Sequence, residues 1–250
     1  MSRPRKRLDT LLVELGLADS RQKAQALVIA GLVTVNDAPA SKPGVAVADG
    51  DQISVKGKDH PYVSRGGVKL AHALDVFHVD PSGMTCLDIG ASTGGFTDCL
   101  LQRGAIKVFA VDVGENQLDY RLRTDPRVVV IEGVNARNMD LSLIADPIEL
   151  VVADVSFISL RLVIPPILPT LVKDGRLVLL VKPQFEAGRE KVGKGIVRDE
   201  KVHEEVLEKL CGFFESIGLV KEGVCESPIL GKKGNKEFFL SLIAGKRVNG

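Results

Sequence analysis

The feature that most constrains the fold is a series of short, almost wholly apolar runs that recur after about residue 60. The runs span residues 86–89, 108–111, 128–131, 150–153, 177–181 and 238–242, and a more polar segment of strand length lies at residues 220–224. Segments of helical character separate several of them, as at residues 95–103 and 201–217. A strand that is apolar at successive positions is buried on both faces of its sheet, and parallel neighbours are joined by helical crossovers. The pattern predicts an α/β fold with a mostly parallel, seven-stranded sheet.

The first 60 residues have a different pattern, which predicts a separate small α+β domain. Leu8, Leu11, Leu12 and Leu15 recur at helical spacing, and Ser20 is placed to cap a second helix. Residues 32–35 and 53–55 are typical of strands, and the polar stretch 56–61 is typical of a linker. A domain of about 55 residues is small but can hold a core. We therefore expect one domain over residues 1–60 and a second over residues 61–250.

The composition and charge of the chain exclude several classes of function. The chain carries 33 Lys and Arg against 32 Asp and Glu, a net charge of +1, so contact with nucleic acid must come from a local basic patch. Four Cys and four His are scattered without metal-ligand spacing, and we expect no metal site. The longest membrane-like stretch, residues 162–172, contains three prolines and is far shorter than the about 20 residues of a membrane span. Since no signal region follows the N-terminus, we expect a soluble cytoplasmic protein without a membrane partner.

The strongest single motif is a glycine-rich turn between an expected strand and an expected helix. Glycines there let a ligand approach the backbone, and Asp88 at the strand end suits a positively charged ligand group. Asp112 ends the next strand and could bind ribose hydroxyls, while Asn135 could contact an adenine edge. A capping role for Asp112 and a turn role for Asn135 are the alternatives. The candidate ligand-binding residues are Asp88, Gly90, Ala91, Ser92, Thr93, Gly94, Gly95, Phe96, Asp112, Asn135 and Asp154.

Charged side chains fall at the ends of other expected strands. Asp154 and Lys182 each follow an apolar run, so both belong to the carboxyl edge of the sheet, where ligands bind in such folds. Glu237 opens the last strand, and Lys69 lies on the helix that precedes the first. Each residue taken alone could equally belong to a surface ion pair.

Five motifs together resemble the FtsJ-like ribose 2′-O-methyltransferases, and nearly the whole chain resembles the TlyA family of rRNA methyltransferases, which is also described as haemolysins. The motifs lie at residues 62–67, 88–96, 152–159, 181–186 and 234–237. The resemblance implies a Rossmann-like class I methyltransferase with S-adenosyl-L-methionine as cofactor. It also implies a catalytic tetrad at Lys69, Asp154, Lys182 and Glu237, all four unsubstituted. The implied reaction is 2′-O-methylation of cytidine ribose in ribosomal RNA, either in the large subunit alone or in both subunits.

Residues 1–60 resemble the small RNA-binding module named after the fourth small-subunit ribosomal protein. Residues 1–23 hold six basic side chains against three acidic ones, which favours contact with RNA phosphates in ribosomal RNA or a ribosomal subunit. A solvated charged face is the alternative. The candidate RNA-binding residues are Arg3, Arg5, Lys6, Arg7, Ser20, Arg21, Lys23 and Arg65.

The same sequence features are compatible with other functions and with other roles for some residues. The rival functions are those of a non-catalytic RNA-binding protein, a small-molecule methyltransferase and a membrane-active haemolysin. The expected helix 201–217 argues against the haemolysin, because it carries acidic residues throughout, unlike a membrane-surface helix.

Two structural roles are also open. Lys182 either accepts the proton of the ribose hydroxyl or stays charged and orients it. The basic segment 184–198, with Arg189, Lys191, Lys194 and Arg198, is either an RNA clamp or a mobile loop. The sequence does not predict an oligomeric state.

Overall fold

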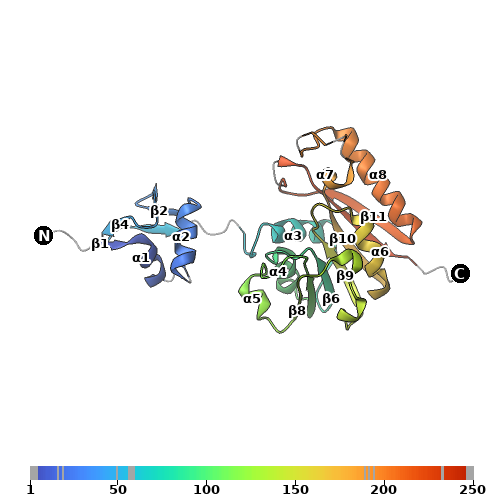
Figure 1. Cartoon of the computed structure of the whole chain (residues 1–250), viewed down its shortest axis with the longest axis horizontal. Helices are drawn as coiled ribbons and strands as arrows, with labels where there is room; N and C mark the ends of the chain where they lie inside the picture. Colours follow the sequence, from blue (N-terminus) through green and yellow to red (C-terminus); the bar gives the residue numbers. More distant parts are fainter. Residues whose placement is uncertain are drawn as a thin grey trace. The chain divides into compact units, whose positions relative to one another are not determined.

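A computed structural model describes residues 5–15, 17–18, 20–48, 50–55, 60–188, 190, 192–193, 195–231 and 234–245. Of the residues singled out above, Arg3, Arg189, Lys191 and Lys194 lie outside these ranges. The chain divides into two compact units, Met1–Pro61 and Tyr62–Gly250, here termed the N-terminal and the C-terminal unit (Figure 1). Each unit is described by itself.

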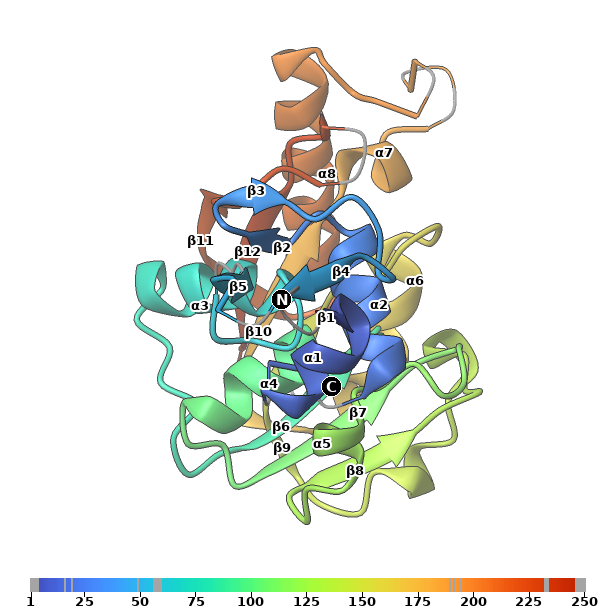
Figure 2. The same ribbon diagram turned by 90° about the vertical axis from the view of Figure 1, so that its left-hand side faces the viewer.

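The N-terminal unit combines two helices with short strands. Its elements are β1 (Arg5–Arg7), α1 (Leu8–Glu14), α2 (Arg21–Ile29), β2 (Val33–Val35), β3 (Ala38–Pro39), β4 (Ala46–Ala48) and β5 (Ile53–Val55). The Ser20 hydroxyl accepts a hydrogen bond from the Lys23 amide at 3.2 Å, so the expected cap of α2 is present. Helices α1 and α2 pack against each other over a core that includes Leu8, Leu12 and Val28 (Figure 2).

The C-terminal unit is built on a seven-stranded sheet in the order β11-β12-β10-β9-β6-β7-β8. The strands are β6 (Thr85–Ile89), β7 (Lys107–Val111), β8 (Val128–Ile131), β9 (Ile148–Ala153), β10 (Leu171–Val181), β11 (Leu219–Glu226) and β12 (Phe238–Ala244). All neighbouring strands are parallel except at β12, which is antiparallel to both β10 and β11. The predicted mostly parallel seven-stranded sheet is therefore confirmed.

Helices cover both faces of the sheet, and successive side chains of a strand point to opposite faces, so they enter two different cores. In β7, Val108 and Ala110 join the core beneath α3 (Gly66–Val76) and α4 (Gly95–Gln102). Phe109 and Val111 join the opposite core, beneath α6 (Leu160–Ile167) and α8 (Glu200–Ser216). This two-sided burial explains the almost continuous apolar runs in the sequence. The smaller elements are α5 (Tyr120–Arg123), α7 (Pro183–Glu186), η1 (Ala136–Asn138), η2 (Leu141–Leu143) and η3 (Leu168–Thr170).

The strand register brings the charged strand-end residues to one edge. Ile89 of β6 pairs with Ala153 of β9, so the glycine-rich turn and Asp154 emerge side by side. On the other side of β9, Val181 of β10 pairs with Phe238 of β12. Because β12 runs in the opposite direction, Lys182 leaves the sheet where Glu237 enters it. The antiparallel strand therefore adds a carboxylate to an edge that is otherwise formed by strand ends.

Candidate active site

A cavity of about 480 Å³ lies at this edge of the C-terminal unit. Its walls come from the turn between β6 and α4, the residues after β9 and β10, the start of α3 and the segment before β12. Lys69, Asp154, Lys182 and Glu237 all line it, although they lie far apart along the chain. The structure thus brings the four predicted catalytic residues to one cavity.

Lys182 is held by two residues of the loop that follows β9. Its ammonium nitrogen lies 2.5 Å from Asp154 Oδ1 and donates a hydrogen bond to Ser156 Oγ at 2.9 Å. The lysine side chain is only 12% exposed, so this charge is mostly withdrawn from solvent. An ion pair in such surroundings is weakly screened and holds both groups in a defined geometry.

Lys69 forms the second ion pair of the cavity. Its ammonium nitrogen lies 2.5 Å from Glu237 Oε2, and the glutamate side chain is buried. An isolated buried carboxylate would be strongly destabilising, and Lys69 from α3 supplies the opposite charge. The tetrad is therefore organised as two lysine–carboxylate pairs, each joining residues from different elements.

Two glycines of the turn allow these elements to approach. Gly90 has a φ of +84°, and a Cβ atom there would lie 2.5 Å from the carbonyl oxygen of Asp154. A Cβ at Gly95 would overlap the Ser64 hydroxyl and lie 2.9 Å from the Gly67 amide nitrogen. The turn consequently contacts both the Asp154 loop and the segment that leads to Lys69, and larger residues would separate them.

Asp88 lies beneath the turn, fully buried. The Thr97 hydroxyl donates a 2.6 Å hydrogen bond to Asp88 Oδ2, whereas Oδ1 accepts none from the described part of the chain. Burial raises the pKa of Asp88 to about 7. A cationic ligand group would stabilise the charged form of this carboxyl, which fits the positively charged ligand expected from the sequence.

The remaining predicted ligand residues fall into two groups. Gly90, Ala91, Ser92, Thr93, Gly95 and Phe96 line the cavity. Asp88, Gly94, Asp112 and Asn135 are not among its described lining residues. The Asp112 carboxylate accepts hydrogen bonds from the Ser92 and Gly114 amides at 2.8 and 2.7 Å, and so supports the turn. Asn135 accepts a hydrogen bond from the Arg137 amide at 3.0 Å and so caps η1. This is the turn role that the sequence offered as the alternative to ligand binding.

An aromatic pair in the cavity wall was not predicted from the sequence. Phe157 is 90% exposed, and its ring centroid lies 4.9 Å from that of Phe185. Its φ of +64° is unusual for a phenylalanine and turns the residue away from a regular strand or helix path. The low aromatic content predicts no broad stacking platform, yet this local pair exposes an aromatic face beside Lys182.

Glu186 joins the two loops that carry Asp154 and Lys182. It accepts a hydrogen bond from the Ser159 hydroxyl at 2.6 Å and another from the Leu160 amide at 2.8 Å, at the start of α6. Burial raises its pKa above the usual value. The motif after β10 therefore supplies a connection between loops in addition to Lys182.

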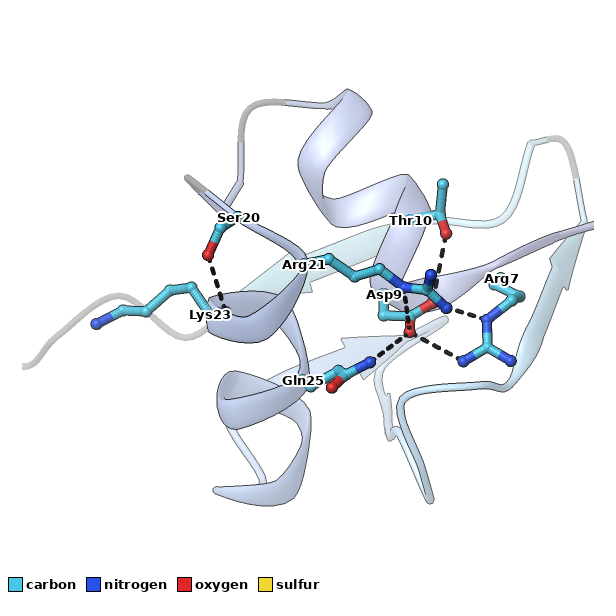
Figure 3. A network of polar contacts seen from close by, with 7 residues as sticks. All are labelled: Arg7, Asp9, Thr10, Ser20, Arg21, Lys23 and Gln25. Atoms are coloured by element: carbon cyan, nitrogen blue, oxygen red, sulfur yellow. Dashed lines mark hydrogen bonds and ion pairs between the residues drawn. The ribbon is translucent and has the colours of Figure 1, made fainter.

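The predicted RNA-binding side chains lie mainly on the N-terminal unit. Arg5 and Lys6 are exposed on β1, and Lys6 pairs with Glu14 at 2.6 Å. Arg7 and Arg21 both contact Asp9. The Lys23 side chain is exposed and points away from this cluster (Figure 3). Arg65 belongs to the other unit, where it is exposed at the start of α3 and lines the cavity.

Comparison with known families agrees with this architecture. A family model described as FtsJ-like methyltransferase matches residues 62–244, which hold the sheet and the cavity. The chain belongs to the FtsJ-like methyltransferases. A second family model, described as S4 domain, matches residues 6–53 of the N-terminal unit. The resemblance inferred from the motifs is confirmed for both parts of the chain.

Several relatives share both parts. YqxC of Bacillus subtilis, which bears a provisional rRNA methyltransferase name, is 49% identical over 97% of this chain and 87% of its own length. The 16S/23S rRNA (cytidine-2′-O)-methyltransferase TlyA of Mycobacterium tuberculosis is 45% identical, over 95% of this chain and 90% of its own length. A solved structure from Streptococcus thermophilus, provisionally named a hemolysin, has a TM-score of 0.76 at 45% identity and covers 98% of this chain and 90% of its own.

Two further observations concern metals and membranes. Within the ranges that the structure describes, no three His, Cys, Asp or Glu side chains are grouped so as to hold a metal ion. Within the same ranges, every helix is too short or too polar to cross a bilayer.

Proposed function

We propose that this protein transfers the methyl group of S-adenosyl-L-methionine to a ribose 2′-hydroxyl of cytidine in ribosomal RNA. The main support for this proposal is that two lysine–carboxylate ion pairs line one cavity, next to the glycine-rich turn. The reaction named for the M. tuberculosis relative supports the choice of cytidine and of ribosomal RNA. A ribosomal RNA substrate supports a cytoplasmic location for the protein.

The residues of the turn fit the proposed cofactor. When bound, S-adenosyl-L-methionine would supply a methyl group already activated by a positively charged sulfur. Gly90 to Gly95 offer backbone that a ligand can approach closely, and Asp112 holds that backbone in place. The free oxygen of Asp88 below the turn favours positive charge nearby.

Lys182 is proposed to orient the ribose hydroxyl. An ammonium group has three N–H donors. Ser156 accepts one of them, and Asp154 forms an ion pair with the same nitrogen, so a donor remains for the 2′-oxygen. As an ammonium group, Lys182 would stabilise the negative charge that develops on this oxygen as the methyl group leaves the sulfur and bonds to it. The hydroxyl proton would then leave to solvent.

The surroundings of the cavity suit an RNA substrate. Sequence-selective proteins usually hold unpaired RNA bases by stacking them on aromatic side chains. Phe157 and Phe185 provide such a face, and the exposed Arg65 can contact a phosphate. A small-molecule methyltransferase would need neither this open aromatic face nor an S4 domain.

A pair of lysine variants tests the proposal. Lys182→Ala should abolish methyl transfer to ribosomal RNA while calorimetry shows nearly unchanged affinity for S-adenosyl-L-methionine. Lys173→Ala is the matched control, because Lys173 is an exposed lysine near the start of β10, whereas Lys182 follows the end of this strand. Near-normal turnover in Lys182→Ala would refute the assigned role.

A further inference from the structure

The N-terminal unit contains a buried carboxylate that contacts two exposed arginines. Asp9, in the first turn of α1, is 0% exposed. Arg7 donates to it from Nε and Nη2, at 3.0 and 2.9 Å, one bond to each carboxylate oxygen. Arg21 Nε and Gln25 Nε2 each donate to Oδ2 at 3.0 Å (Figure 3). One acid therefore joins β1, α1 and α2.

The balance of charge and burial in this cluster is unusual for a purely structural ion pair. Arg7 is the main cause that holds the pKa of Asp9 well below its usual range, so the carboxylate is charged at neutral pH. A single arginine would neutralise it, whereas two are present and the cluster keeps a net positive charge. The side chains of Arg7 and Arg21 remain 53% and 58% exposed. The excess charge is thus presented to solvent.

The hydrogen-bond geometry leaves donors available. Arg21 uses only Nε, so both of its terminal nitrogens are unused by Asp9, and Arg7 keeps Nη1. Among the described residues, both guanidinium groups donate hydrogen bonds to Asp9 alone. Free guanidinium edges bind phosphate oxygens well because their planar donors match two oxygens at once.

We propose that Asp9 is a positioning residue, which fixes Arg7 and Arg21 as one preorganised site for a backbone phosphate of RNA. The inference takes from the proposed function only that RNA is the partner. A free arginine loses rotamer freedom when it binds, and that loss is smaller when the side chain is already held. The site reads phosphate and not base, so it contributes affinity and register without sequence preference.

Simple electrostatics predicts the opposite effect of removing Asp9. An acid on an RNA-binding face repels phosphate, so its neutralisation should tighten binding. If Asp9 positions the arginines, Asp9→Asn should weaken binding of the full chain to a ribosomal RNA fragment by roughly tenfold, the ordering cost of two long side chains. Glu14→Gln is the matched control, since it also removes one acid from this unit, but Glu14 pairs with Lys6 and not with the two arginines. That control should bind equally or more tightly.

Three further measurements make the test decisive. In an Arg7→Gln/Arg21→Gln background, Asp9→Asn should have no further effect, because the residue acts through these arginines. Arg7→Lys and Arg21→Lys keep the charge but lose the Nε contact, so they should also weaken binding, and they decide the matter if Asp9→Asn fails to fold. In methyl transfer, Asp9→Asn should raise KM for RNA and leave kcat unchanged.

The proposal is overturned if folded Asp9→Asn binds RNA as tightly as the unchanged protein, or if both lysine variants do. RNA affinity is measured without cofactor. A protein that binds RNA through this site but transfers no methyl group would therefore contradict the proposed function alone.

Discussion

The burial of Asp88 predicts how the free energy of unfolding changes with pH. Its pKa is 3.8 in an unfolded chain and rises to about 7 on burial. Below about pH 4 the carboxyl is protonated in both states, so its burial carries no charge penalty. As the pH rises from 3.8 to about 7, the unfolded chain ionises while the folded protein keeps the proton. The free energy of unfolding therefore falls across this window, and the loss is complete above pH 7.

The size of the effect follows from the shift. One pH unit within the window changes the free energy of unfolding by about 1.4 kcal/mol, so the full contribution is about 4 kcal/mol. The stabilisation is present below the unfolded pKa and is lost as the pH rises through the folded one. Asparagine at this position is neutral in both states and removes the dependence. The stability difference between the unchanged protein and Asp88→Asn should thus shift by about 3 kcal/mol between pH 5 and pH 7.5, in favour of the variant at the higher pH.

Urea denaturation of the unliganded full chain measures this difference. Both tyrosines, Tyr62 and Tyr120, belong to the C-terminal unit, so tyrosine fluorescence reports its unfolding. Asp174→Asn is a suitable control, because Asp174 is exposed and asparagine tolerates its φ of +61°. If the stability difference between Asp88→Asn and the unchanged protein were the same at both pH values, the assigned burial effect on Asp88 would be wrong.

Two other substitutions test the cavity. Gly90→Ala should lose affinity for S-adenosyl-L-methionine in calorimetry, because its Cβ would collide with the Asp154 backbone. Gly83→Ala is the control and should bind normally, because Gly83 also has a positive φ but a Cβ there has no atom within 4 Å. Equal binding by both variants would remove the argument for a close backbone approach. Glu186→Gln should lower kcat by roughly tenfold with little change in cofactor affinity, because it weakens the contact to Ser159 that joins the two catalytic loops. An unchanged kcat would show that this contact does not position them.

Much of the sheet could be predicted because two-sided burial leaves a direct trace in the sequence. The run at 128–131 coincides with β8, whereas β10 begins at Leu171, six residues before its apolar run. Polar residues and a register shift between Leu171 and Arg176 interrupt that strand, so its first part lacks the signal. Helix α6 was not predicted because Pro165 and Pro166 lie within it. Strands β1 and β4 are too short to show a period.

Site residues were predictable to different degrees. The tetrad could be proposed from strand ends and the family resemblance, because the topology itself brings strand ends together. The pairing of Lys69 with Glu237 could not be derived, since it depends on how α3 packs beside β12. Phe157 gave no signal because its exposure depends on a positive φ. Asp9 was counted only as one acid among basic residues, and its contacts with Arg7 and Arg21 arise from tertiary packing.

If the cavity methylates a ribose hydroxyl of cytidine in ribosomal RNA, the product of the reaction is 2′-O-methylcytidine. Mass spectrometry of nucleosides from ribosomal RNA tests it most directly, with RNA from cells that lack the gene incubated with the purified protein and S-adenosyl-L-methionine. We expect 2′-O-methylcytidine to appear with the unchanged protein and with Lys173→Ala, but not with Lys182→Ala. Methylation on a base, or 2′-O-methylcytidine formed equally by Lys182→Ala, would contradict it.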